Sequence, residues 1–448
     1  MNYYHILFII IFVVGCKENN DFAIETNSTD LVKSFKEYWP NETGFLDSTE
    51  IAVHDFASAA DCIDCHSEYY NEWSRSSHSR SFTSPIFQSG WNDAISDFPN
   101  TGERFCIQCH SPIAFVTGEN MDNSSGHYDL LKEGVTCTVC HSFSGFGKTI
   151  NANDHISANA EYKLNPGENI MYGSIKDPIE NSYHNSEFSR LYSRSDMCLP
   201  CHDFTIRGIE AEITFSEWNL ATAGGMHEGN SCQSCHMPYR NGRHEHDFIG
   251  VDIDLTKSIN TDDIQYKKVD SLLKTSVEIE FMFGNELNNI ITNDTIYIPI
   301  SIKSLIHHSL PSGTSFTREA WIEMILQQND QVIFSSGRLE NNISDINLYD
   351  PNLLLFTSNI LSAAGDTLFS ITKTQYYFPQ LLPALSTKNW IYRFNNVDQI
   401  DFSKPLDIST RMLFRPFKPA SLRKSHDSLL DNLPIFEMSR IDTTIYFN

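Results

Sequence analysis

Hydrophobic and polar residues alternate in four short runs in the part of the chain after residue 255. A hydrophobic or β-branched side chain at every second position is the pattern of a strand with one buried face. The alternating positions are Val277, Ile279, Phe281 and Phe283; Ile296, Ile298, Ile300 and Ile302; Ala320, Ile322, Met324 and Leu326; and Ile408, Thr410, Met412 and Phe414. Residues that favour turns lie between the runs, at 284–285, 311–313, 329–330 and 350–351. This spacing predicts an antiparallel β-sandwich, which we place at residues 275–420.

The remainder of the chain lacks this alternation. We expect short helices and long loops at residues 51–255, and a short helix at about residues 262–273 within a connecting segment, residues 256–274. Residues 16–50 are polar, which predicts a tether, and residues 421–448 are assigned to a C-terminal tail. The predicted fold class is therefore α+β multidomain, with a mainly α-helical, loop-rich N-terminal domain before the sandwich.

The candidate chemistry lies in the N-terminal domain, which contains five copies of Cys-x-x-Cys-His. Chance would produce roughly 0.01 such pentads in a chain with 11 Cys and 17 His among 448 residues. The five cysteine pairs are Cys62 and Cys65, Cys106 and Cys109, Cys137 and Cys140, Cys198 and Cys201, and Cys232 and Cys235. The histidines that follow them are His66, His110, His141, His202 and His236.

This motif is typical of c-type haem attachment. Two thiols one helical turn apart form thioethers with the haem vinyl groups, and the next imidazole reaches the iron from the same side. Zinc sites use cysteine pairs in twos and require no histidine after each pair, and a redox dithiol occurs once, in a thioredoxin-like context. The motifs therefore predict five covalently bound haem c groups, whose porphyrins replace much of the side-chain core of this domain.

The eleventh cysteine, Cys16, follows a short apolar run at residues 6–14, which is too short to span a bilayer. The run ends in small residues before the cysteine and resembles a lipoprotein signal, residues 1–15, with lipidation of Cys16. Its first residues lack the usual Lys or Arg, and a plain secretory signal is the alternative. Both interpretations export the chain. We expect a bacterial cell-envelope location, lipid-anchored on the periplasmic face or outer surface.

The chain is acidic, with 57 Asp and Glu against 32 Lys and Arg and a net charge of −25. This charge disfavours nucleic acid as a partner. It favours a redox partner with a basic docking face, although it also serves simply to keep the surface soluble.

The haem domain resembles the cytochrome c-552/4-type multihaem family, which is related to ammonia-oxidiser tetrahaem cytochromes and to hydroxylamine oxidoreductases. The similar segments are Trp73, Ser76 and His78 after the first motif, and residues 134–137, 195–198, 232–238 and 246–250 at the later ones. Residues 308–313 and 318–321 resemble, more weakly, a β-domain appended to some members. The resemblance covers roughly residues 55–415.

The resemblance implies which histidines bind the second axial position of each iron. It points to His78, His184, His246 and His308 as distal ligands, with His244 as a competitor of His246. Four such ligands must serve five irons. Either the fifth comes from His54, His127, His155 or His227, or one iron is five-coordinate. No catalytic residue is identified, and no Cys-x-x-Cys-Lys variant of the nitrite reductases occurs.

The expected function is electron transfer, since a second histidine saturates the iron and leaves one-electron chemistry. The expected partners are redox proteins or a membrane quinol-linked electron donor. The alternative is a multihaem reductase or oxidase of a small nitrogen or sulfur compound at one five-coordinate haem, which leaves open whether the protein is an enzyme. The β-domain could also be a docking module.

Overall fold

The computed structural model describes residues 51–99, 102–122, 126–146, 162–167, 169–206, 209–223, 230–283, 291–292 and 294–447. The predicted signal, Cys16, the tether, His155, His227 and the predicted turn at 284–285 lie outside these residues. Within the described ranges, no helix combines the length and the apolar character needed to cross a membrane.

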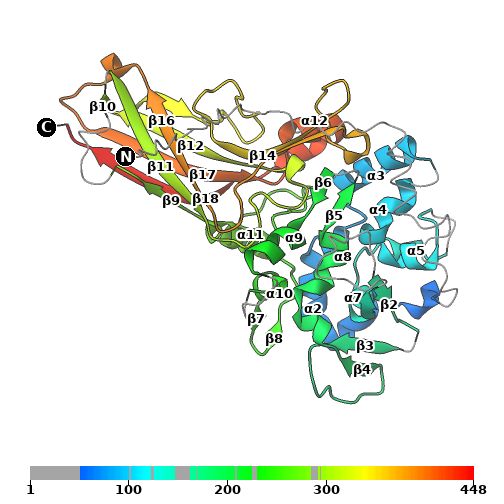
Figure 1. Cartoon of the computed structure of the whole chain (residues 1–448). Helices are drawn as coiled ribbons and strands as arrows, with labels where there is room; N and C mark the ends of the chain where they lie inside the picture. The colour runs from blue at the N-terminus through cyan, green and yellow to red at the C-terminus, as the bar shows by residue number, and fades with distance from the viewer. Residues whose placement is uncertain are drawn as a thin grey trace, which may run out of the picture.

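The N-terminal half is built from short helices joined by loops and two-stranded sheets (Figure 1). Its α-helices are α2 (Ile63–Arg75), α3 (Pro85–Asp97), α4 (Gly102–His110), α5 (Pro112–Thr117), α6 (Tyr128–Leu131), α7 (Cys137–His141), α8 (Leu199–His202), α9 (Thr214–Ala221) and α10 (Cys232–His236). Its strands pair as β1 (Phe143–Phe146) with β2 (Tyr162–Leu164), β3 (Ile170–Gly173) with β4 (Asn185–Phe188), β5 (Phe204–Ile206) with β6 (Ile209–Glu212), and β7 (Tyr239–Arg240) with β8 (Arg243–His244).

Each Cys-x-x-Cys-His motif lies in helical backbone, which brings its two thiols onto one turn. The third and fifth motifs form the whole of α7 and α10, and each is capped by a hydroxyl directly before the first cysteine. Thr136 Oγ1 accepts a hydrogen bond from the Val139 amide at 3.3 Å, and Ser231 Oγ accepts one from the Ser234 amide at 3.2 Å. Such caps start these helices at the first cysteine because they satisfy amides that have no partner within the helix.

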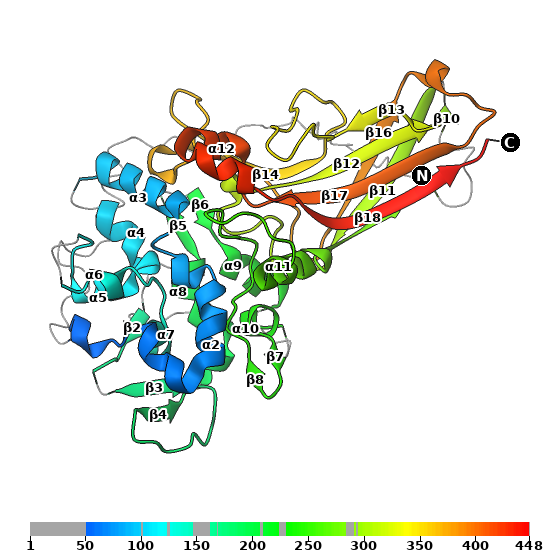
Figure 2. The ribbon, with the colours of Figure 1, turned by 180° about the vertical axis from the view of Figure 1, so that it is seen from behind.

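The C-terminal half is a sandwich of two antiparallel sheets, as predicted (Figure 2). One sheet contains β9 (Val277–Phe281), β10 (Ile291–Thr292), β11 (Thr295–Ser304) and β16 (Thr387–Phe394). The other contains β12 (Glu319–Gln328), β13 (Gln331–Ser336), β14 (Leu355–Leu361), β15 (Tyr376–Gln380), β17 (Leu406–Arg415) and β18 (Phe436–Ile445). The fold class is confirmed: a helical N-terminal region is followed by a region rich in antiparallel strands.

The alternating residues of the sequence form the core between the two sheets. Ile298 and Ile300 of β11 and Ile322 and Met324 of β12 belong to one buried cluster and are 0–1% exposed. Burial of each such side chain contributes about 1.5–3 kcal/mol. The sandwich therefore has a side-chain core of its own, independent of any haem.

Two boundaries differ from the sequence prediction. Residues 421–448 are not a tail, because they contain the end of α12 (Pro419–Ser425) and the whole of β18, which pairs with β17 along its length. Phe436 and Met438 face the core, but Arg440 and Asp442, at the next alternating positions, are exposed. A register shift against β17 between Met412 and Leu413 moves the inward face of β18 to Ile441 and Ile445, so the sequence shows no unbroken alternation here. Strand β9 ends at Phe281, before the predicted Phe283. The predicted connecting helix is α11 (Ile264–Lys274), capped by Asp263.

The two halves contact each other through ion pairs as well as packing. Lys373 of the sandwich half lies 2.6 Å from Asp97 of α3, and Thr372 donates to the same carboxylate. Arg75 of α2 contacts Asp247, which also pairs with Lys268 of α11. Figures 1 and 2 show the sandwich projecting from the haem-motif half, with only one end against it.

Candidate haem sites

Four of the five motif histidines face a second histidine across a constant distance. The ring centres are 6.2–6.4 Å apart in all four pairs. The pairs are His66 with His184, His202 with His78, His141 with His246, and His236 with His308. These partners are the four distal candidates from the sequence, and the structure brings each of them to a different motif.

This distance fits two imidazoles that share one iron. A metal–imidazole bond is about 2 Å long and the ring centre lies about 1.1 Å beyond the nitrogen, so two axial rings are about 6.3 Å apart. Two pairs also have nearly parallel planes, at 14° for His141 and His246 and 22° for His236 and His308. The residues present therefore fit haem iron at four motifs.

Hydrogen bonds at Nδ1 orient these rings. Nδ1 of His141 lies 2.8 Å from the Tyr172 carbonyl oxygen, and Nδ1 of His236 lies 2.5 Å from that of Ile249. Among the distal candidates, Nδ1 of His246 contacts the His244 carbonyl and Nδ1 of His308 the Ser309 carbonyl, both at 3.0 Å. A ring that donates from Nδ1 presents Nε2 to the metal, as metal-bound histidines usually do.

Burial keeps three of the distal candidates, His78, His246 and His308, neutral, which is the form that binds a metal. Burial lowers the pKa of His78 to about 3. It lowers the pKa of His246 and that of His308 to about 4. Nδ1 of His78 is buried and has no hydrogen-bond partner among the described residues. This ring instead packs edge-on against Phe248, with 4.5 Å between ring centres.

His110 of the second motif has different surroundings. Its Nδ1 lies 2.7 Å from the Ser81 carbonyl oxygen, but its ring stacks on Phe87 with 3.8 Å between ring centres. Within the described parts of the chain, no histidine ring lies opposite His110 at the distance seen in the other pairs. Burial lowers the pKa of His110 to about 4, so it too is a neutral imidazole.

The candidates for a fifth distal ligand remain without support from the described residues. The side chain of His54 is 81% exposed and contacts Asp55, and His127 is exposed just before α6. His155 and His227 lie outside the described residues. His244 is separated from its competitor His246, because its Nδ1 contacts the Met237 carbonyl at 2.6 Å and its ring packs on Tyr239.

The motifs lie next to one another in a definite order. The sulfur of Cys62 lies next to that of Cys137, that of Cys109 next to that of Cys201, and that of Cys198 next to that of Cys232. Cys140 is also near enough to Cys201 to interact electrostatically. The first motif therefore adjoins the third, the third adjoins the fourth, and the fourth adjoins both the second and the fifth.

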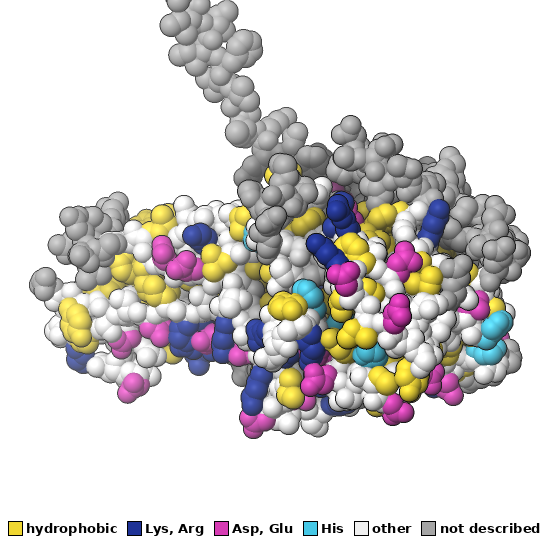
Figure 3. Space-filling model, turned by 90° about the horizontal axis from the view of Figure 1, so that it is seen from below, with side chains coloured by type: hydrophobic (Ala, Val, Ile, Leu, Met, Phe, Trp, Pro, Cys, Tyr) yellow, Lys and Arg dark blue, Asp and Glu magenta, His cyan; other side chains and the backbone are white. Residues whose placement is uncertain are grey.

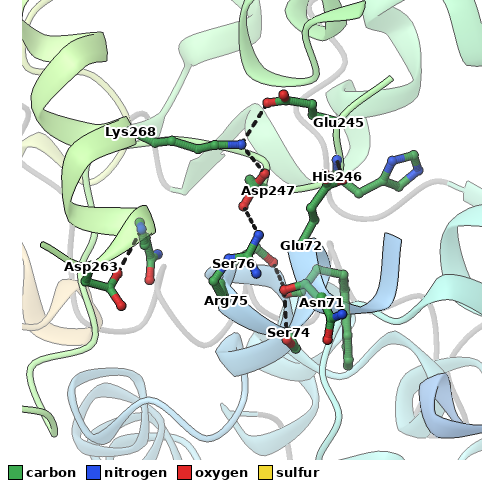
Figure 4. Close-up of polar contacts among 12 residues, drawn as sticks. Asn71, Glu72, Ser74, Arg75, Ser76, Glu245, His246, Asp247, Asp263 and Lys268 are labelled. Atoms are coloured by element: carbon green, nitrogen blue, oxygen red, sulfur yellow. Dashed lines mark hydrogen bonds and ion pairs between the residues drawn. The ribbon is translucent and has the colours of Figure 1, made fainter. Parts of the chain in front are cut away.

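A charged network that the sequence did not reveal holds His246. Figure 4 shows Glu72 beside His246, and Lys268 in contact with Glu245 and Asp247, the residues on either side of His246 in sequence. Glu72 of α2 is only 8% exposed, and its Oε2 accepts from the His246 amide at 2.8 Å. Arg243 donates to both oxygens of this carboxylate, at 2.8 and 2.6 Å. Burial raises the pKa of Glu72, but the bonds from Arg243 and His246 outweigh it and leave that pKa below its usual value. Nothing in the sequence indicated this role, because Glu72 belongs to no motif and looks like any other polar residue of an amphipathic helix.

We expect Glu72→Gln to loosen His246. The amide keeps an acceptor for the His246 backbone but loses the paired bonds from Arg243, at a cost of about 1–3 kcal/mol in the free energy of unfolding. Denaturant unfolding and the rate at which cyanide binds the oxidised protein measure the effect. Glu68→Gln is the control, since Glu68 also contacts Arg243 but is 75% exposed, so we expect less than about 1 kcal/mol there. Equal effects of the two changes would contradict this role of Glu72.

The other acidic residues near motifs differ among themselves. Asp64 is exposed, whereas Asp203 is buried and accepts a hydrogen bond from the Ser216 amide at 2.7 Å, at the start of α9. Asp64 is therefore a surface residue, and Asp203 has a structural role at the start of α9.

Comparisons with known proteins agree with this geometry. Residues 61–142, which span the first three motifs, match the family model described as cytochrome c554 and c-prime. The structure is similar to a penta-heme cytochrome c552 from Thermochromatium tepidum, with a TM-score of 0.66, 17% identity, and coverage of 88% of this chain and 100% of that one. No curated protein matches the chain.

The motifs, the paired histidines and these matches define a multihaem c-type cytochrome, with covalently bound haem c. The family match indicates electron transfer as its general activity.

Proposed function

We propose that this protein is a pentahaem cytochrome that transfers electrons in the bacterial cell envelope. The observation that carries the proposal is the set of four histidine pairs at 6.2–6.4 Å, one for each of four motifs. Haem iron with two imidazole ligands exchanges single electrons and has no free position for a substrate. The remaining haem, at the second motif, would be held by Cys106, Cys109 and His110.

The order of the motifs supports a continuous route for electrons. The first, third, fourth and fifth motifs are linked by neighbouring thiols, and the second branches from the fourth. Cys65 and Cys235 are exposed, while the other described cysteines are partly covered. Since these two belong to the first and fifth motifs, we propose that electrons enter and leave at the two ends of this route.

The surface supports a docked redox partner rather than a nucleic acid. Figure 3 shows histidine side chains at the surface of the haem half among hydrophobic side chains, with Asp and Glu scattered around them. With a net charge of −25, the protein would attract a partner with a basic docking face. We propose a redox protein or a membrane quinol-linked donor as that partner, and lipidation of Cys16 as the anchor that keeps the protein at the membrane.

A second candidate function rests on His110. The described residues place Phe87, and no histidine, against this imidazole. An iron with an open position could bind and reduce a small nitrogen or sulfur compound. This activity requires that neither His155 nor His227 binds the iron of the second motif.

Haem count and spin state test both candidates. We expect the denatured mature protein to have a mass increased by five haems, together with the lipid on Cys16. If all irons have two histidine ligands, electron paramagnetic resonance of the oxidised protein shows low-spin signals alone. An open iron at His110 would instead give about one fifth high-spin iron and fast cyanide binding. A mass short of five haems would overturn the pentahaem proposal, and turnover of hydroxylamine or nitrite with the high-spin signal would favour the enzyme.

A further inference from the structure

Two carboxylates, one buried and one half-buried, lie where the haem half meets the segment that carries His308. Glu217 is in α9, and its Oε2 accepts from the Ser309 amide at 3.1 Å and from Ser312 Oγ at 2.7 Å. Glu212 ends β6, and its Oε1 accepts from Thr214 Oγ1 at 2.5 Å. Thr214 Oγ1 also lies 2.7 Å from Ser312 Oγ, so two hydroxyls link the two carboxylates. The three contacts of this link need three protons and the hydroxyls supply two, so the chain of hydrogen bonds is complete only when one carboxyl carries a proton.

The sandwich backbone packs directly on this pair. Gly313 has a φ of +73°, and a Cβ added there would lie 2.9 Å from Oε2 of Glu212. Glu212 is 9% exposed. The close approach of the backbone excludes water from one side of the carboxylate and leaves hydroxyl and amide groups as its neighbours.

The pair has no cation bound to it. In the parts of the chain that the structure describes, neither Glu212 nor Glu217 forms an ion pair with Lys or Arg, and the nearby Arg318 lies 2.6 Å from Asp252 instead. Two carboxylates joined through hydroxyls, without a cation, cannot both be ionised cheaply in a buried place. Burial accordingly raises the pKa of Glu212 and that of Glu217, and the negative charge of Glu212 raises that of Glu217 further.

The pair is connected to one iron site through the backbone. Ser309, whose amide binds Glu217, directly follows His308, and the His308 ring lies 6.4 Å from that of His236. Reduction of an iron between these rings adds one negative charge close to the carboxylates, which favours binding of a proton there. The other charged or titratable groups around the pair and its segment are Asp203, Glu210, Asp252, His307, Arg318 and Tyr377.

We propose that Glu212 and Glu217 together hold one exchangeable proton whose uptake accompanies one-electron reduction of the iron between His236 and His308. In this step a redox partner or a chemical reductant supplies the electron, the ferric iron becomes ferrous, and one carboxylate takes a proton from water. No bond to the iron changes. The inference rests on the proposed haem ligation by His308 and adds proton transfer to the proposed electron transfer.

Proton uptake on full reduction of the holoprotein tests this proposal. A pH indicator in weakly buffered solution measures the uptake as a reductant is added, at several pH values above the usual pKa of glutamic acid, about 4.3. We expect Glu217→Gln and Glu212→Gln each to lower the maximum uptake by up to one proton per molecule. In the unchanged protein, one midpoint potential should fall by up to about 59 mV per pH unit, the value for one proton per electron, and this slope should vanish in the variants.

Glu210→Gln is the matched control, because Glu210 lies on the same strand as Glu212 but is exposed. Its uptake should equal that of the unchanged protein. Full uptake and an unchanged slope in both test variants would overturn the proposal, and the two variants keep it testable if one fails to fold. The spin state of His308→Ala is a separate readout: no increase in high-spin iron over the unchanged protein would refute ligation by His308, whatever the proton uptake.

Discussion

Replacement of His308 by alanine is expected to convert one low-spin iron in the oxidised protein to high-spin. His308 comes from the sandwich half, yet its ring lies 6.4 Å from that of His236 in the fifth motif. No other described histidine faces His236 at this distance, so alanine leaves that iron with one protein ligand. Compared with the unchanged protein, the high-spin signal should increase by about one fifth of the total iron.

The same change should loosen the sandwich from the haem half. If His308 binds that iron, the bond would supplement the contacts at Asp97 and Asp247. Its loss should then make residues 256–274 more sensitive to proteolysis. His307→Ala is the control, because it removes the neighbouring imidazole and leaves His308 in place. Spectra of His308→Ala identical to those of the unchanged protein would show that the sandwich contributes no ligand.

Replacement of His246 by alanine is expected to have an equally large effect on the iron of the third motif. Its ring lies 6.4 Å from that of His141 with only 14° between the planes, and Glu72 and the His244 carbonyl hold it there. Alanine removes the second imidazole, and about one fifth of the iron should become high-spin and bind cyanide quickly. Because the third motif connects the first with the fourth, electron transfer between the two ends should slow as well.

His244→Ala distinguishes the two neighbouring histidines. Since the His244 ring packs on Tyr239 and contacts the Met237 carbonyl, its loss should leave every spectrum unchanged. A high-spin signal in His244→Ala, with none in His246→Ala, would reverse the assignment of the ligand.

Some features could be predicted because the information lies in neighbouring residues. The Cys-x-x-Cys-His motifs place three reactive groups within one turn of helix, and Ile298, Ile300 and Ile302 alternate because successive strand residues face opposite sides. The prediction of a C-terminal tail at residues 421–448 was wrong for a related reason. A register shift within β18 breaks its alternation, so Phe436 and Met438 face the core but Arg440 and Asp442, two and four positions further on, are exposed.

Other features depend on residues that are distant in the chain. The resemblance to a family suggested His78, His184, His246 and His308, but not which motif each one faces. His78, next to the first motif in sequence, lies opposite His202 of the fourth. Glu72 and Glu217 carried no recognisable pattern, since the groups that each carboxylate binds lie in a segment far along the chain.

By itself, the sequence determined that the protein attaches haem covalently and that a sandwich follows, because both depend on the local spacing of residues. Only the tertiary structure decided the pairing of histidines, the order of the motifs and the contact of His110 with Phe87, with no second imidazole opposite it among the described residues. These depend on how loops without periodicity pack against each other. The packing is a sum of many long-range contacts, which no short stretch of sequence contains.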